Sequence, residues 1–105
     1  MCSIILRICE TGVLIGANRD EMLARAWDAP AEYWPEFPGV VAGRDRTAGG
    51  TWLGINRHGM VAAVLNRQGT LGPAAGKKSR GELPLLALAE TSLQAAGAKI
   101  LVSAE

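Results

Sequence analysis

The stretch Val13-Leu14-Ile15-Gly16-Ala17-Asn18-Arg19-Asp20-Glu21 joins an apolar run directly to four polar residues. An apolar run of this length between a glycine and a polar cluster is typical of a short buried strand. The preceding segment 2–9 also has the character of a strand, and Glu10-Thr11-Gly12 suits the loop of a hairpin. The polar cluster is therefore predicted to lie where the second strand of this hairpin ends.

Antiparallel pairing across this loop is expected to bring Cys2 beside Asn18, Arg19 and Asp20. If Met1 is removed, Cys2 carries both a thiol nucleophile and an α-amine, which can act as a general base near neutral pH. Positive charge from Arg19 would lower the pKa of the thiol and raise its thiolate fraction. Two alternatives are an inert buried cysteine and a solvated Arg19–Asp20 pair, which would contribute only about 0–1 kcal/mol.

The chain has 105 residues, and we treat residues 1–105 as a single small domain. Hydrophobic residues make up 49% and charged residues 20%, a globular composition. The net charge of +1 gives no electrostatic basis for a nucleic-acid partner. No apolar run of about 18 residues exists, so no membrane span is predicted. No basic region precedes the apolar N-terminus, which argues against a signal peptide.

Cysteine and histidine usage indicates a reduced setting without a structural metal. Two cysteines do not make a disulfide framework, so we expect a cytoplasmic location. One histidine and two cysteines at these spacings match no zinc pattern, and no metal or cofactor is expected.

The chain after the polar cluster is predicted to form a loop, three strands and two helices. A short helical turn at 21–25 precedes a loop from Trp27 to Pro38, which is rich in proline. Aromatic side chains of this loop can pack over the edge of the core or form the wall of a ligand pocket. Strands are predicted at 40–43, 51–56 and 60–65, with Asn56-Arg57-His58-Gly59 as a hairpin turn.

Two helices are predicted near the end of the sequence. The first is capped by Ser79 in a capping box, or begins nearer Leu83 with Pro84 at its first position. The second is capped by Thr91 or Ser92 and runs toward Val102. The small residues Gly54, Ala62 and Ala63 indicate that another element packs closely on the hairpin before these helices.

Asn66 is a second polar residue that ends an apolar strand. Its side-chain amide can donate a hydrogen bond to a developing oxyanion, as such groups do in acyl transfer. The alternative is a turn or capping residue. We assign no role to His58, which is expected to be exposed in the hairpin turn.

Four motifs occur in order: Met1-Cys2-Ser3-Ile4-Ile5, Ala17-Asn18-Arg19-Asp20-Glu21, Gly49-Gly50-Thr51-Trp52-Leu53-Gly54 and Arg80-Gly81-Glu82-Leu83. Together they resemble the NRDE family, which includes the transport and Golgi organisation protein 2 proteins, over residues 1 to about 90. That family is related to N-terminal-nucleophile hydrolases. The resemblance implies an α+β fold, the α-β-β-α sandwich of those hydrolases. Because family members are typically more than twice this length, we expect the N-terminal half of the sandwich.

A further similarity reaches the choloylglycine hydrolases, which also begin Met-Cys and carry a Gly-x-Asn-x-x-Gly hairpin, here Gly54 to Gly59. The similarity implies that Cys2 is the nucleophile, that Arg19 tunes it and that Asp20 orients the terminal amine. It also implies that Asn66 and a backbone N–H form the oxyanion hole. We expect Asn18, Trp34 and Trp52 to contact the substrate.

The function that we predict is hydrolysis of a non-peptide C–N amide bond in a small molecule, through an acyl-Cys2 intermediate. A second hypothesis is a non-enzymatic protein that binds haem or another hydrophobic metabolite, for which the loop with Trp27, Trp34 and Phe37 would matter more. A third is a structural role with a vestigial catalytic pair. If the chain is complete, an open sheet edge would favour a homodimer.

Overall fold

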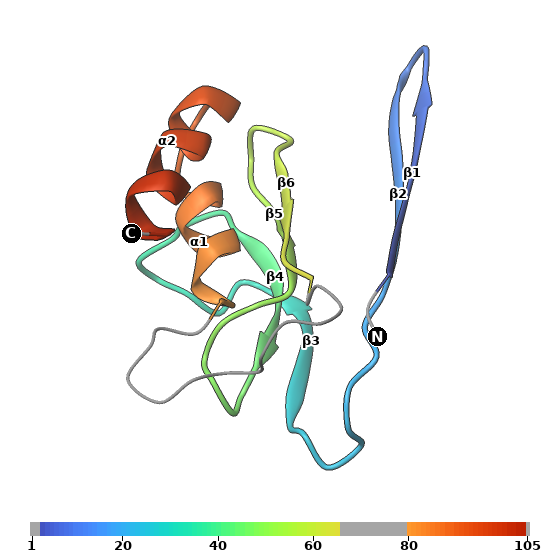
Figure 1. Cartoon of the computed structure of the whole chain (residues 1–105), viewed down its shortest axis with the longest axis vertical. Helices are drawn as coiled ribbons and strands as arrows, with labels where there is room; N and C mark the ends of the chain where they lie inside the picture. Colours follow the sequence, from blue (N-terminus) through green and yellow to red (C-terminus); the bar gives the residue numbers. More distant parts are fainter. Residues whose placement is uncertain (1–2, 66–79, 105) are drawn as a thin grey trace.

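The computed structural model describes residues 3–65 and 80–104 and confirms a mixed α+β fold (Figure 1). One sheet is the hairpin of β1 (Ser3–Cys9) and β2 (Gly12–Asn18). The other has the order β3-β4-β5-β6, and every neighbouring pair in it is antiparallel. Its strands are β3 (Trp27–Ala31), β4 (Val41–Asp45), β5 (Leu53–Ile55) and β6 (Val61–Ala63). The helices are α1 (Glu82–Leu88) and α2 (Leu93–Ala104).

The β1–β2 hairpin has the predicted pairing, but it is not buried as predicted. Ser3 pairs with Asn18 and Cys9 with Gly12, so Glu10 and Thr11 form the turn. However, Leu6 is 62% exposed, and all of β2 is exposed. The reason is visible in Figure 1, where the hairpin extends past the four-stranded sheet and no other described element covers most of its length. The prediction that Val13–Ala17 is a buried strand is therefore wrong for the described part of the chain.

The predicted loop over Trp27–Pro38 is wrong in its first five residues, because residues 27–31 form β3. Pro30 lies inside this strand although it cannot donate a backbone hydrogen bond. The strand tolerates it because β3 is at the edge of its sheet and its register with β4 shifts between Asp28 and Ala31. Edge strands and bulges are the places where sheets accept proline.

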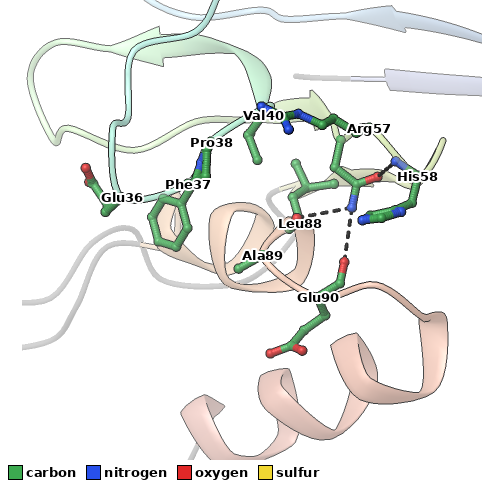
Figure 2. Close-up of a pocket in the computed structure, with 10 residues that line it drawn as sticks. Glu36, Phe37, Pro38, Val40, Arg57, His58, Leu88, Ala89 and Glu90 are labelled. Carbon is green, nitrogen blue, oxygen red and sulfur yellow. Dashed lines mark hydrogen bonds between the residues drawn. The ribbon is translucent and has the colours of Figure 1, made fainter.

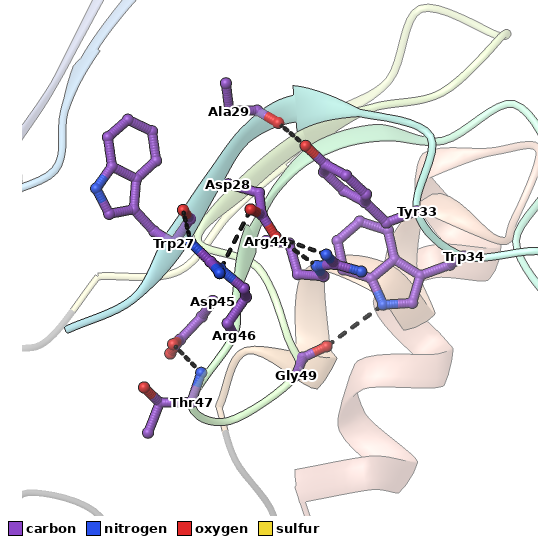
Figure 3. A network of polar contacts seen from close by, with 10 residues as sticks. All are labelled: Trp27, Asp28, Ala29, Tyr33, Trp34, Arg44, Asp45, Arg46, Thr47 and Gly49. Atoms are coloured by element: carbon purple, nitrogen blue, oxygen red, sulfur yellow. Dashed lines mark hydrogen bonds and ion pairs between the residues drawn. The ribbon is translucent and has the colours of Figure 1, made fainter.

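Ion pairs connect β3 and the turn before it to β4 and the residue after it (Figure 3). Asp28 accepts from Arg44 at 2.7 Å and from Arg46 at 3.2 Å. Arg25 and Asp45 form a second ion pair at 2.6 Å, and the carboxylate of Asp45 also accepts from the Thr47 N–H. These pairs explain why β4 continues to Asp45, whereas the strand was predicted to end at residue 43.

The hairpin turn between β5 and β6 is confirmed. The N–H of Gly59 donates to the carbonyl of Asn56 at 3.2 Å, and Gly59 has the positive φ of 78° that favours glycine. The expected close packing is present as well. A Cβ on Gly54 would lie 2.7 Å from the Cβ of Ala42 and 2.9 Å from Cδ1 of Leu88. The absence of a side chain at Gly54 therefore lets α1 approach the sheet.

Helix α1 begins at Glu82, and its N-cap position is Gly81, with no capping side chain. Of the two predicted starts, the cap at Ser79 falls on a residue outside the described ones, and the alternative start near Leu83 is one residue from the observed start, although Pro84 is the third helical residue and not the first. Contact with the sheet fixes the helix start instead: the Thr51 N–H donates to the Gly81 carbonyl at 3.1 Å. A Cβ on Gly50 would come within 2.6 Å of the Gly81 backbone. These contacts bring the Gly-Gly-Thr-Trp and Arg-Gly-Glu motifs together.

The second helix has the predicted cap, since Ser92 Oγ accepts from the Ala95 N–H at 3.2 Å. In space, α1 lies against β5 and β6, and α2 lies against α1. Figure 1 shows both helices on one side of the four-stranded sheet and the β1–β2 hairpin on the other. Among the described residues, the buried core consists of Val40, Ala42, Leu85 and Leu88. No helix in the described ranges is long and apolar enough to cross a membrane.

Candidate functional site

The candidate site lies at the end of the β1–β2 hairpin where Asn18 pairs with Ser3. Arg19 and Asp20 follow Asn18 directly, and Cys2 is bonded to Ser3. The predicted register is therefore confirmed up to the residue next to Cys2. Cys2 and Asn66 themselves lie outside the described residues.

Arg19 stacks on the indole of Trp52, with its guanidinium carbon 4.3 Å from the ring centroid. Trp52 comes just before β5, so this contact connects the hairpin to the second sheet. A Cβ on Gly43 would collide with the Trp52 ring, so the glycine in β4 makes room for the indole. Trp27 of β3 meets Trp52 edge-on, with 6.3 Å between ring centroids and 74° between planes. Two tryptophans and an arginine from three separate segments thus form one cluster.

A cavity of about 220 Å³ adjoins this cluster. Its lining consists of Arg19, Glu21, Met22, Leu23, Trp27 and Trp52. The rim is unusually apolar for an exposed surface, because Met22 is 76% exposed and Trp27 is 52% exposed. A second hollow next to it has Asn18 and Trp52 in its wall, together with Ile4 and Leu53. Exposed apolar side chains around a concavity mark a binding surface more often than isolated ones do.

The pKa of the Asp20 carboxyl is lowered from its ordinary value. The first cause is a hydrogen bond from the chain's terminal amino group, and the positive charge of that group is the second. Asp20 is fully exposed, so solvent screens this interaction. This amino group belongs to Met1, whereas the resemblance implies that Asp20 orients the amine of Cys2 after Met1 is removed.

Trp34 lies in a different part of the molecule from Arg19. It packs against the core together with Phe37, and its Nε1–H donates to the Gly49 carbonyl at 3.3 Å (Figure 3). It lines a separate hollow with Gly49 and Leu85. Trp34 and Phe37 therefore pack on the core and also line this separate hollow, whereas Trp27 lines the cavity beside Arg19.

Another cavity of about 200 Å³ lies at the C-terminal end of α1, at a distance in sequence from the cluster (Figure 2). His58 is exposed at its edge, and Asn56 lies in its wall. Sequence reasoning gave Asn56 no individual role, yet it is 8% exposed and makes four side-chain hydrogen bonds. Its position in the Gly-x-Asn-x-x-Gly hairpin was the signal that could have indicated it.

The described residues contain no group of three or more His, Cys, Asp or Glu side chains arranged to hold a metal ion. Arg19 forms no ion pair with another described side chain, and its guanidinium stacks on Trp52. Within the described ranges, the groups that this cluster can present to a ligand are therefore the guanidinium of Arg19, the carboxylate of Glu21 and the aromatic surface of Trp27 and Trp52.

Comparison with models of known protein families shows which family this chain belongs to. The family described as Transport and Golgi organisation 2 matches it over residues 1–103. The chain belongs to the Transport and Golgi organisation 2 family. The match includes all four sequence motifs, two of which meet at the contact between Gly50 and Gly81.

Among the Transport and Golgi organisation 2 relatives is the Transport and Golgi organization protein 2 homolog of Bos taurus, which is 37% identical over 83 residues. The matched region covers 76% of this chain and 29% of the bovine protein. The chain therefore spans under a third of the length of this relative. No solved structure matches the chain.

Proposed function

We propose that this chain carries the nucleophile end of an N-terminal-cysteine amidohydrolase, which cleaves a non-peptide C–N amide bond in a small molecule. The observation that carries the proposal is the register Ser3–Asn18. It brings Ser3, where β1 begins, beside the strand end that Arg19 and Asp20 follow, and these two residues are the cation and the carboxylate that such chemistry uses. The fold belonging to this proposal is the α-β-β-α sandwich of N-terminal-nucleophile hydrolases, of which the chain would supply the N-terminal half.

In the proposed reaction, the Cys2 thiolate attacks the amide carbonyl carbon, and the terminal α-amine holds the thiol proton. The C–N bond breaks, the proton passes to the departing amine, and a thioester to Cys2 remains. Water then attacks the thioester, with the α-amine as general base, and the carboxylic acid leaves. Asn66 would donate to the oxyanion in both steps, while Asp20 orients the amine and Arg19 favours the thiolate. The reaction uses no cofactor or metal.

Intact mass with brief thiol alkylation at neutral pH tests the first requirement. We expect loss of Met1, together with labelling of Cys2 that is much faster than labelling of Cys9, which is a free half-buried thiol. Cys9→Ser is the matched control, and it should leave the fast labelling unchanged. Retained Met1, or equal rates at the two thiols, would contradict the proposal.

A screen of small-molecule amides tests turnover itself. Cys2→Ser is expected to abolish or sharply reduce hydrolysis while the circular dichroism spectrum stays the same, because the substitution removes the nucleophile from an unchanged fold. Arg19→Gln should slow both hydrolysis and Cys2 alkylation, since it removes the positive charge that favours the thiolate. Hydrolysis that survives Cys2→Ser would exclude the acyl-cysteine route.

A second candidate function is non-enzymatic binding of haem or another hydrophobic metabolite, and the apolar rim of the Arg19 cavity favours it. Met22 and Leu23 are both exposed there beside Trp27. The cavity, at about 220 Å³, is smaller than most ligand pockets, so haem would also have to lie on surface outside it. Haem titration separates the two functions. A Soret shift that persists in Cys2→Ser favours haem binding, whereas the absence of any Soret shift favours hydrolysis.

A further inference from the structure

We propose that the cavity beside Arg19, Trp27 and Trp52 binds small anions with a flat apolar body, such as aromatic carboxylates. This deepens the proposed hydrolase function, and it rests on that function only for the statement that the bound molecule is a substrate. The binding itself can be measured without turnover.

The charge preference follows from the surroundings of Arg19. Its guanidinium lies over the Trp52 indole and forms no ion pair with any described side chain. Other arginines in the described region, such as Arg25 and Arg44, are neutralised by Asp45 and Asp28. A guanidinium stacked on an aromatic face keeps its N–H donors at the edge, where they match the two oxygens of a carboxylate.

The preference for a flat apolar body follows from the two indoles. Trp27 and Trp52 meet at 74°, so their surfaces form an aromatic corner, and Met22 extends the apolar surface at the rim. Rings pack favourably against such a corner in offset or edge-on arrangements. The room made at Gly43 lets Trp52 occupy its position without a clash. The aromatic surface therefore exists before any ligand arrives.

Glu21 also lines the cavity, and its charge opposes an anion there. Its Oε1 accepts from the Met22 N–H at 3.1 Å, so this carboxylate lies against its own turn. The proposal consequently makes a second, independent statement about charge: neutralising Glu21 should strengthen anion binding, whereas neutralising Arg19 should weaken it.

The probe is 2-naphthoate, with the neutral ketone 2-acetylnaphthalene as its isostere, titrated calorimetrically into the whole chain. We expect naphthoate to bind at least tenfold more tightly than the ketone, which has no amide bond to hydrolyse, with affinity that falls as salt rises. Arg19→Gln should remove this difference, Arg19→Lys should restore part of it, and Glu21→Gln should increase it. Arg7→Gln is the matched control, because it removes the same charge from an exposed position further along β1.

The three indole N–H resonances report where the probe binds, because the chain has three tryptophans. Those of Trp27 and Trp52 should shift on addition of naphthoate, while that of Trp34 should stay in place. Equal affinity for the two probes, no effect of Arg19→Gln, or equal shifts at all three indoles would overturn the proposal.

Cys2→Ser separates the two proposals. Naphthoate binding that persists in this variant, alongside a failed amide screen, would overturn the hydrolase function alone. Selective Cys2 alkylation without any naphthoate binding would overturn the anion pocket alone.

Discussion

At the scale of single residues, Asn56 is the side chain that attaches the β5–β6 turn to the end of α1. Its Nδ2 donates to the carbonyls of Leu88 and Glu90, each at 3.1 Å. Its Oδ1 accepts from the N–H groups of His58 and Met60 at 2.9 and 3.0 Å. The last carbonyls of a helix have no partner within the helix, so Asn56 satisfies groups that would otherwise be left unpaired.

We predict that Asn56→Ala lowers the free energy of unfolding by about 2–4 kcal/mol, because it leaves several buried polar groups without a hydrogen-bond partner. Urea denaturation measures the effect. Asn56→Asp should recover only part of the loss, since a carboxylate keeps the two acceptor contacts but repels the carbonyls at the helix end. Asn18→Ala, at an exposed strand end, is the control. Similar losses at the two positions would show that the four hydrogen bonds of Asn56 contribute little.

Protonation of the Asp45 carboxylate is expected to lower the stability of the fold at acidic pH. Burial alone would raise the pKa of its carboxyl, but hydrogen bonds from Arg25 and from the backbone of Thr47 and Ala48, together with the charge of Arg25, outweigh it and leave the pKa below its ordinary value. A pKa that is lower in the folded state gives stability that is present above the unfolded value near 4 and lost as pH falls through the folded one.

We therefore predict that Asp45→Asn lowers stability by about 1–2 kcal/mol at pH 7 and flattens the loss of stability between about pH 5 and pH 2. Urea midpoints measured across this range test it. Glu10→Gln, which removes an exposed carboxylate in the β1–β2 turn, should leave the acid profile as it is. An unchanged profile in Asp45→Asn would mean that other carboxylates control the acid response.

Residue types and order predicted part of the candidate site. The apolar run that ends in a polar cluster, together with the hairpin loop before it, was enough to place Arg19 and Asp20 at the hairpin end, because local pairing fixes that geometry. The approach of Trp27 to Trp52 depends on the pairing of β3 with β4 and on space at Gly43, which are non-local facts. For the same reason the sequence could not separate Trp34 from this cluster.

At the scale of elements, the contact between the start of β5 and the start of α1 depends on two glycines without side chains. A Cβ on Gly50 would lie 2.6 to 2.9 Å from backbone atoms of Gly81, and backbone cannot move aside as a flexible side chain can. We predict that Gly50→Ala destabilises the fold by about 1–3 kcal/mol through overpacking. Thermal or urea unfolding measures the change.

Gly97 provides the matched control for that substitution. It lies inside α2, and a Cβ there would meet nothing within 4 Å. Gly97→Ala should therefore stabilise the chain by about 0.5–1 kcal/mol, because alanine costs less conformational entropy in a helix. If the two substitutions changed stability in the same direction, the close approach of Gly50 to Gly81 would not be the cause.

Elements with local signals were predicted well, and those that depend on tertiary contacts were not. The β5–β6 turn and the Ser92 cap follow from residues within a few positions of each other. Strand β3 was missed because Pro30 signals a loop, and only the edge position and the shifted register make it acceptable. The cap at Ser79 was predicted from spacing alone, whereas contact with Thr51 fixes the start of α1 at Glu82.

At the scale of the whole molecule, the β1–β2 hairpin presents an apolar face that the described elements leave uncovered over most of its length. Residues paired across antiparallel strands share a face, so the register groups six apolar side chains on one side. They are Ile4, Leu6, Ile8, Val13, Ile15 and Ala17. Only the end with Ile4 and Ala17 reaches Trp52 and Leu53 of the second sheet. Leu6 and Ile8 remain 62% and 84% exposed.

No other described strand pairs with the edges of this hairpin, and most of its apolar face is uncovered by described residues. We therefore predict that the 105-residue chain self-associates through it. Sedimentation velocity over a hundredfold range of concentration should show a mass that rises with concentration. Leu6→Glu should weaken this association by at least tenfold, because it buries a charge in the shared apolar surface. Ile5→Glu, the same type of change on the neighbouring residue, points to the opposite face and should have a smaller effect. A monomer at all concentrations would contradict the prediction, and equal effects of the two substitutions would assign the association to the strand edges instead of to this face.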